Sequence, residues 1–251
     1  MDAIFSNFML LSLCLGIGLL AGVVKGMVGF AMPMILVSGL GSVIAPELAL
    51  AGLILPTLVT NGMQATRQGL GEALASVKRF RLFLATGLVT ILLSSQLVRV
   101  LPIEVMLAVI GGPIVVFSAM QLAGWQPRLK PSPKVEMSVG AFAGFIGGLS
   151  GVWGPPTVAY LTALGTEKSE QIRVQGVIYG LGALALTGAH MASGILNATT
   201  VWFSAVMLVP AVLGMQIGSV LHDRIDQSVF RRATLIVLLV AGVNLLRRAL
   251  F

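Results

Sequence analysis

The sequence predicts an all-α polytopic membrane protein with two inverted repeats, each made of a Gly/Pro-broken hairpin segment and three transmembrane helices. Three observations lead to this fold class. The 251-residue chain is 57% hydrophobic and only 10% charged, with a mean hydropathy of +0.98, which is too apolar for a soluble domain. Apolar runs long enough to cross a bilayer recur along it. A motif rich in glycine and proline also occurs twice in one register.

Seven apolar runs come close to the roughly 20 residues that a transmembrane helix needs. They are Ile4–Val24, Leu48–Gln64, Leu82–Val98, Val105–Trp125, Val174–Leu196, Val201–Leu221 and Ala233–Leu246. Two shorter apolar stretches, Met27–Leu40 and Pro155–Leu164, remain. The first of these is expected either to span the membrane or to re-enter it.

The internal repeat pairs GIGLLAGVVKGMVGFAMP with GAFAGFIGGLSGVWGPP. Four glycines and a proline recur in one register, so that Gly18, Gly22, Gly26, Gly29 and Pro33 fall on Gly140, Gly144, Gly148, Gly151 and Pro155. We interpret this as a duplication. Residues 1–125 form the first repeat, 126–134 the cytoplasmic linker QPRLKPSPK, and 135–251 the second repeat, with one transport domain built from both.

The orientation follows from Lys and Arg, which accumulate in cytoplasmic loops. Basic residues cluster in the loop between Gln64 and Leu82, in the linker, and in stretches 168–173 and 224–232. The short loops 99–104 and 196–200 are nearly charge-balanced or uncharged, which places them outside. The helices of the two halves then run in opposite directions, as in many secondary transporters. Both termini lie outside in this scheme, and Val135–Leu164 enters and leaves on the cytoplasmic face as a hairpin.

The glycines and prolines of the motif break a helix within an apolar stretch. Lipid cannot satisfy non-helical backbone, so such a break must be buried in protein or line a cavity. We expect residues 148–156 to turn between two half-helices, the second of which offers an anion its positive N-terminus. Close helix packing is the favoured interpretation of four glycines, Gly18, Gly22, Gly140 and Gly144. A ligand-lined turn is favoured for Gly148, Gly151 and Gly154.

The duplicated motifs GLLAGVVKGMVGFAMP and GFIGGLSGVWGPP, with a basic linker between them, resemble the sulfite exporter TauE/SafE family, also called the toluene-sulfonate uptake permease family. The resemblance covers nearly the whole chain. It implies a secondary transporter of the cytoplasmic (inner) membrane for sulfite, a sulfonate, sulfoacetate or a similar organic anion. Members commonly carry a fuller glycine run before the proline, where this chain has Ala31 and Met32.

Polar residues within spans are costly in lipid and usually functional. Lys25 is a candidate for the charge that balances an anion, or it snorkels at a helix end. Arg173 is expected to form a two-pronged pair with a sulfonate, or it serves only topology. The other candidates supply neutral donors or interhelical hydrogen bonds, or shape the breaks. The full expected substrate site is Lys25, Gly29, Asn61, Gln64, Gly148, Gly151, Trp153, Gly154, Arg173, Gln175 and Tyr179.

His190 is the candidate for a coupled proton, with a water-bonded outer histidine as the alternative. The sequence contains no catalytic motif, metal-ligand cluster or phosphate-binding loop, so no enzyme activity, metal or cofactor is expected. The net charge of +7 comes largely from topology loops, which argues against nucleic acid. Expected partners are the anion and membrane lipid, and a coupling proton or Na⁺ and a homo-oligomer are compatible with this interpretation. A passive anion channel or a membrane scaffold for sulfur metabolism is the alternative function.

Overall fold

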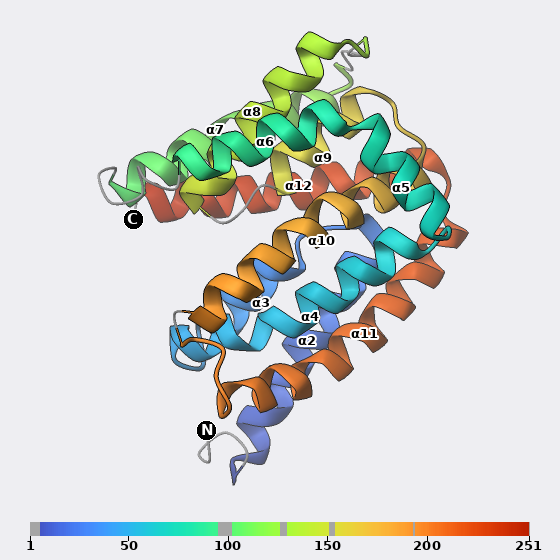
Figure 1. Ribbon diagram of the computed structural model, residues 1–251. Helices are drawn as coiled ribbons and strands as arrows, with labels where there is room; N and C mark the ends of the chain where they lie inside the picture. The colour runs from blue at the N-terminus through green and yellow to red at the C-terminus, as the bar shows by residue number, and fades with distance from the viewer. Residues whose placement is uncertain (1–5, 95–101, 126–129, 151–153, 193, 251) are drawn as a thin grey trace. The chain divides into compact units, whose positions relative to one another are not determined.

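The computed structural model describes residues 6–94, 102–125, 130–150, 154–192 and 194–250. Within these residues all regular structure is helical (Figure 1). The helices are α2 (Phe8–Val28), α3 (Met32–Leu40), α4 (Pro46–Thr66), α5 (Leu70–Arg79), α6 (Arg81–Ser94), α7 (Ile103–Leu122), α8 (Pro133–Ser150), α9 (Gly154–Ala163), α10 (Lys168–Ala192), α11 (Thr200–Arg224) and α12 (Gln227–Leu250).

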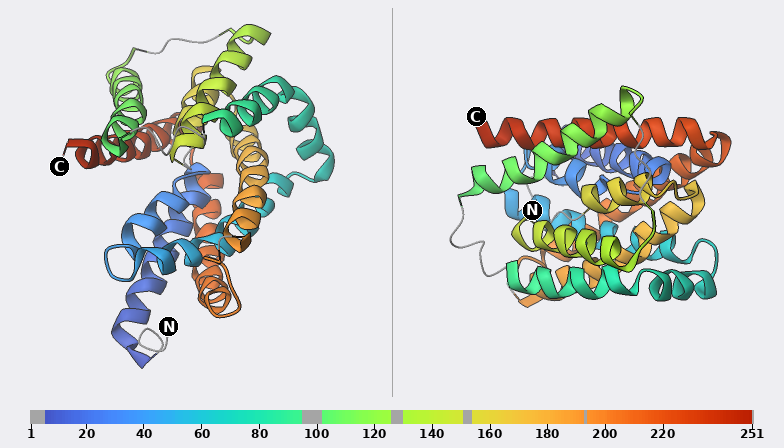
Figure 2. Two further views of the ribbon diagram at one scale, coloured as in Figure 1. Left: turned by 60° about the vertical axis from the view of Figure 1, so that its left-hand side comes forward. Right: turned by 90° about the horizontal axis from the view of Figure 1, so that it is seen from above.

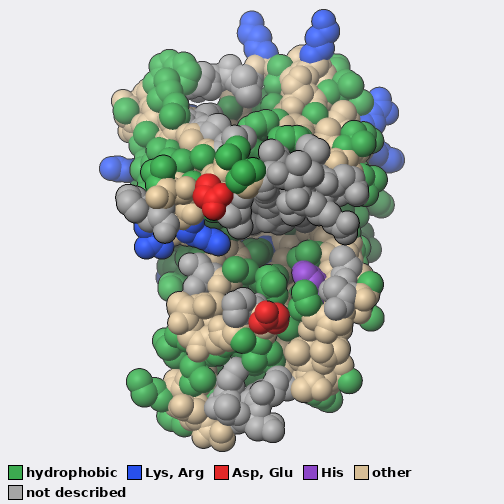
Figure 3. Space-filling view, turned by 90° about the vertical axis from the view of Figure 1, so that its left-hand side faces the viewer, with side chains coloured by type: hydrophobic (Ala, Val, Ile, Leu, Met, Phe, Trp, Pro, Cys, Tyr) green, Lys and Arg blue, Asp and Glu red, His purple; other side chains and the backbone are tan. Residues whose placement is uncertain are grey.

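The described helices have the length and surface of a membrane protein. Five of those in the described residues are long and apolar enough to cross a bilayer: α2, most of α4, α10, α11 and α12. The shorter α6 is also apolar and exposes Leu88, Leu92 and Leu93. On the face shown in Figure 3, apolar side chains are widespread and acidic ones sparse. Exposed apolar surface on this scale suits acyl chains rather than water. The chain is therefore a multi-pass membrane protein.

The chain forms two compact units, and each takes helices from both halves of the sequence. Unit 1 consists of Met1–Leu70 and Ile172–Asp226, and unit 2 of Gly71–Gln171 and Gln227–Phe251. The division runs through α10, whose first residues belong to unit 2 and whose remainder belongs to unit 1.

In unit 1, α2 lies along α11 over most of its length (Figure 1). Glycines allow the two backbones to touch. A Cβ atom built on Gly22 would lie less than 3.0 Å from the carbonyl oxygen of Ala211, and one on Gly26 would collide in the same way with Met215. From the other side, Gly214 and Gly218 of α11 face the backbone of α2 equally closely. Gly22 therefore has a packing role, which is the interpretation favoured by its spacing.

In unit 2, α8 lies along α6 and α7 crosses α12 (Figure 2). Gly140 and Gly144 of α8 face the backbone of α6 as closely as Gly22 faces α11. Glu136 fixes the start of α6, because its Oε1 accepts hydrogen bonds from the N–H groups of Leu82 and Phe83, each at 3.1 Å. The carboxylate thus caps a helix N-terminus from another helix.

Several helices are longer than the apolar runs that predict them. The stretch between Gln64 and Leu82, predicted as a loop, contains α5, and α10 begins at Lys168 rather than near Val174. Hydropathy identifies the part of a helix that lies in the hydrocarbon core of the membrane. Lys, Glu and Arg also favour helix, so a helix can continue beyond that apolar part. Likewise α8 continues to Ser150, so that Gly148 lies in its last turn rather than in the link.

Candidate functional site

The break between α2 and α3, residues 29–31, combines two left-handed residues. Gly29 ends α2 with φ of 89°, and its N–H donates to the carbonyl of Lys25 at 2.7 Å. Ala31 then precedes α3 with φ of 73°, which L-residues other than Asn and Asp seldom adopt. No side chain caps the start of α3, which has proline in its first turn. The break therefore presents an uncapped helix N-terminus inside unit 1.

Lys25, one turn before the break, is buried with only 1% of its surface exposed. Its Nζ donates to Oδ1 of Asn61 on α4 at 2.5 Å. Among the described residues, no carboxylate forms an ion pair with Lys25. The side chain does not snorkel to the surface, and the partner that the structure gives it is a neutral amide.

Two buried glutamines meet Gly29 from different helices. Gln64 of α4 donates through Nε2 to the carbonyl of Gly29 at 3.1 Å. Gln175 of α10 packs its amide directly against Gly29. Within the described part of the chain, the Oε1 of Gln64 and both amide atoms of Gln175 have no hydrogen-bond partner. Buried amide groups without partners cost about 1–3 kcal/mol each, so this cluster is unfavourable unless something binds there.

The buried polar side chains on one face of α4 include two residues that the sequence analysis did not select. Thr57 and Thr60 are also buried, and Thr57 Oγ1 has no partner among the described residues. Thr57 precedes Asn61 by four positions and Thr60 precedes Gln64 by four, so they lie on the same helix face. The sequence signal that identifies Thr57 and Thr60 is the recurrence of polar residues at helical spacing within an apolar run.

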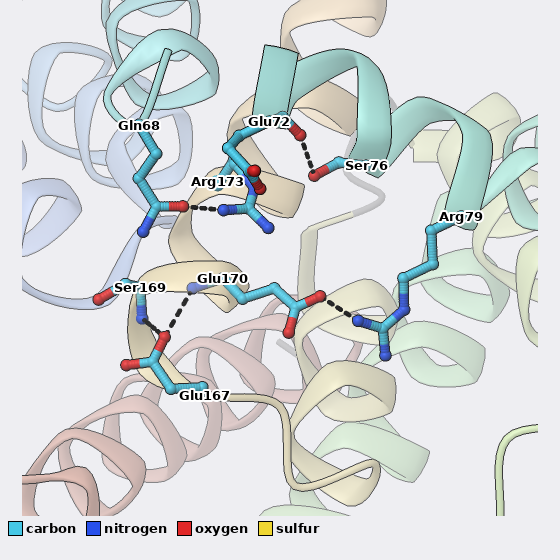
Figure 4. Close-up of polar contacts among 8 residues, drawn as sticks. All are labelled: Gln68, Glu72, Ser76, Arg79, Glu167, Ser169, Glu170 and Arg173. Carbon is cyan, nitrogen blue, oxygen red and sulfur yellow. Dashed lines mark hydrogen bonds and ion pairs between the residues drawn. The ribbon is translucent and has the colours of Figure 1, made fainter. Parts of the chain in front are cut away.

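Tyr179 and Arg173 occupy different faces of α10. Tyr179 is buried and lies one turn beyond Gln175, on the same face. Arg173 is half-buried, and its guanidinium donates to the side-chain oxygen of Gln68, after the end of α4 (Figure 4). Arg173 and Gln175 are two positions apart, so the two side chains point in different directions around the helix. Arg173 therefore lies on a different face of α10 from Gln175 of the cluster at Gly29.

The remaining expected site residues belong to the second break or to helix ends. Gly148 lies in the last turn of α8 and Gly154 begins α9, while Gly151 and Trp153 lie outside the described residues. His190 is half-buried in the last turn of α10. Sequence reasoning missed His222, because hydropathy places it at a loop. It is fully buried on α11, and its Nδ1 lies 3.2 Å from the carbonyl oxygen of Met27.

We call Lys25, Asn61, Gln64 and Gln175, grouped around Gly29, the first-break cluster. It combines one cationic group, amide groups and the positive end of α3, a set that suits an oxyanion. In the part of the chain that the structure describes, no group of three or more His, Cys, Asp or Glu residues could hold a metal ion.

Comparison with protein families gives the same identity as the duplicated motifs. The model of the family described as sulfite exporter TauE/SafE matches residues 14–245, nearly the whole chain. Comparisons with curated proteins and with solved structures gave no significant match. The matched region contains the first-break cluster, the described helices from α3 to α11, and most of α2 and α12. The chain therefore belongs to the sulfite exporter TauE/SafE family of membrane transport proteins.

Proposed function

We propose that the protein is a secondary transporter that moves a small sulfur-containing anion across the cytoplasmic (inner) membrane. Sulfite, a sulfonate, sulfoacetate or a similar organic anion would bind at the first-break cluster. The family is one of membrane anion exporters, which supports the broad class of substrate.

The burial of the Lys25 ammonium group beside a neutral partner is the main support for this proposal. A buried ammonium group needs a compensating charge, because burial removes its hydration. Its described partner, Asn61, supplies a dipole and no charge. An anion at the break would supply that charge, and it would also accept from Gln175 Nε2 and from the first N–H groups of α3. Arg173 is the second candidate for the binding cation.

The proposal includes an inverted repeat, which two equivalent interfaces support. Gly22 on α2 faces the carbonyl of Ala211 on α11, and Gly144 on α8 faces the carbonyl of Gly87 on α6. Since Gly22 and Gly144 are matched in the sequence repeat, the same helix contact occurs once in each unit. We extend the proposal to a site of the same kind at the second break, formed by Gly148, Gly151, Trp153 and Gly154.

Coupling to a proton or Na⁺ distinguishes this proposal from a passive channel or a scaffold. His190 and the buried His222 are the candidates for a coupled proton. In proteoliposomes, a transporter should show saturable sulfite flux that an imposed ion gradient accelerates. Flux that rises linearly with sulfite concentration would indicate a channel, and absence of flux with sulfite, sulfoacetate and taurine would contradict transport of these anions.

Substitution of Lys25 tests the site. Lys25→Met preserves length and removes the charge, so it should weaken sulfite binding about ten- to a hundredfold, as expected for losing a charge-assisted hydrogen bond of roughly 1.5–3 kcal/mol. Arg173→Gln is the comparison variant, because it removes the second candidate cation, which lies on a different face of α10 from Gln175. Unchanged affinity in Lys25→Met together with a loss in Arg173→Gln would transfer the principal charge to Arg173.

A further inference from the structure

Unit 2 contains a cavity of about 280 Å³ that is separate from the first-break cluster. It lies where the turn after α9 meets the first turns of α10 and α12. Its volume is close to the lower end of the range for small-molecule sites. The described residues that line it are Thr162, Leu164, Gly165, Thr166, Gln171, Gln227 and Arg231.

Gln227, the first residue of α12, holds one wall of the cavity in place. Its Oε1 accepts from the backbone N–H of Lys168 at 2.8 Å, and its Nε2 donates to the carbonyl of Thr166 at 3.1 Å. The two bonds join the α9–α10 turn to the start of α12. The wall that carries Thr166 is therefore fixed by tertiary contacts.

Three polar side-chain atoms of the lining have no partner within the described residues: Thr162 Oγ1, Thr166 Oγ1 and Gln171 Nε2. The three residues are more than nine-tenths buried, with exposed fractions of 5%, 7% and 2%. The Gln171 nitrogen can only donate a hydrogen bond, and each hydroxyl can donate one. Buried groups of this kind are expected to have partners, and the partner that satisfies all three is an acceptor.

Arg231 adds a positive charge to the same cavity. Its Nη2 donates to Oε1 of Gln121 on α7 at 2.5 Å, which anchors the guanidinium beside the lining. No acidic residue is among the described residues that line the cavity. Of the two acids at the start of α10, Glu167 accepts from the N–H groups of Ser169 and Glu170, and Glu170 pairs with Arg79 (Figure 4).

We propose that this cavity binds a small oxyanion, such as sulfite, sulfate, phosphate or a carboxylate, held by Arg231 with Gln171, Thr162 and Thr166. The guanidinium matches two oxygens of such an anion, and the other three groups donate to the remaining lone pairs. On the topology predicted from loop charges, the cavity opens on the cytoplasmic side. The oxyanion is then either a free solute or the phosphate of a lipid headgroup. The site does not depend on the first-break cluster, which belongs to unit 1.

The test measures oxyanion binding in a Lys25→Met background, in which the first-break cluster is disabled. Titration calorimetry of purified protein uses sodium sulfite and sodium phosphate as free probes, and native mass spectrometry uses phosphatidylglycerol as the lipid probe. Thr166→Val removes a hydroxyl that bonds to nothing in the described protein, so folding is retained while oxyanion affinity falls about two- to tenfold. Arg231→Gln should lower the affinity about ten- to a hundredfold.

Thr234→Val is the matched control, because Thr234 of α12 is also fully buried without a partner for its hydroxyl among the described residues, yet it does not line the cavity. Loss of affinity in Thr166→Val but not in Thr234→Val supports the site. Binding of sulfite or phosphate identifies a solute, and binding of the lipid alone identifies a headgroup. Equal affinity in all variants, or no binding of sulfite, phosphate or phosphatidylglycerol, overturns the proposal. Gln171→Met replaces Arg231→Gln if the latter does not fold.

Failure of this site and failure of the proposed transport site are distinguishable. If Lys25→Met keeps the wild-type transport and affinity, the first-break cluster is not the transport site. The effect of Thr166→Val relative to Thr234→Val still decides the cavity in that case.

Discussion

Gly29→Ala is the most direct perturbation of the first break. A Cβ atom at this position would lie less than 3.0 Å from Gln175 Oε1 and 3.0 Å from both Gln175 Cδ and Ile172 Cδ1. It would also place an L-residue at φ of +89°. The left-handed backbone costs roughly 1–2 kcal/mol, and overpacking in a dense region adds about 1–3 kcal/mol. We therefore expect Gly29→Ala to lower the free energy of unfolding by roughly 2–5 kcal/mol.

Gly69→Ala isolates the backbone part of this cost. Gly69 has φ of +93° and no atom within 4 Å of a built Cβ, so its substitution adds left-handed strain without a collision. Both changes reduce the entropy of the unfolded chain equally, and that effect cancels in the comparison. Chemical unfolding in mixed micelles should show Gly29→Ala less stable than Gly69→Ala by about 1–3 kcal/mol.

The double variant Gly29→Ala/Gln175→Ala identifies the contact responsible. Removing the Gln175 amide removes the closest collision and leaves the contact with Ile172, so the double-mutant cycle should give a favourable coupling of roughly 0.5–3 kcal/mol. Equal stability of Gly29→Ala and Gly69→Ala, or zero coupling with Gln175, would refute the placement of Gln175 against the break.

Three further predictions concern packing, helix capping and topology. Gly22→Val should destabilise the protein strongly, whereas Gly16→Val should not, because the position of Gly16 on the same helix has open space. Thermal unfolding in detergent compares the two variants. Equal midpoints would argue against the α2–α11 contact. Glu136→Ala should lower the free energy of unfolding by roughly 1–3 kcal/mol, because two N–H groups of α6 lose their acceptor. Glu136→Gln should have a smaller effect. An Ala variant as stable as wild type would contradict the capping role of Glu136. Ser132→Cys, on a Cys14→Ser background, should resist an impermeant thiol reagent added outside intact cells, and rapid labelling would reverse the proposed topology.

The sequence predicts the helices well because hydrophobicity and glycine spacing act locally. The motif glycines mark both the close helix contacts and the break at Gly29, since glycine permits the close backbone approach and adopts the left-handed conformation without steric cost. Helix ends are less predictable, because α10 continues past the hydrophobic run to Lys168, where Glu167 and Gln227 accept from N–H groups of its first turn. The same effect conceals His222, which follows the apolar part of α11 yet is fully buried.

The pairing of site residues depends on tertiary structure and cannot be obtained from spacing. Lys25 and Asn61 are far apart in the chain, and no local pattern specifies that they bond. Arg173 and Gln175 are close in sequence, yet helix geometry directs them to different faces. Ala31 is a contrasting case, because a local sequence pattern indicates its backbone conformation. The family resemblance predicts more glycine here, and the positive φ of Ala31 shows why glycine would be favoured at this position.

The first break is positioned by two glycine-mediated helix contacts within unit 1. Gly22 and Gly26 hold α2 against α11 up to the turn that carries Lys25, while Gly176 of α10 packs on Gln64 and Ala65 of α4. The three helices that supply side chains to the cluster, α2, α4 and α10, are thus held by close contacts at glycines, which contribute no side chain to the site. The polar groups without partners around Gly29 therefore cannot move to hydrogen-bond one another at a small cost in free energy, because each belongs to a close-packed helix. On the proposed function, a ligand that accepts hydrogen bonds and carries negative charge would accept from Gln175 Nε2 and pair with Lys25, whereas a water molecule supplies no compensating charge.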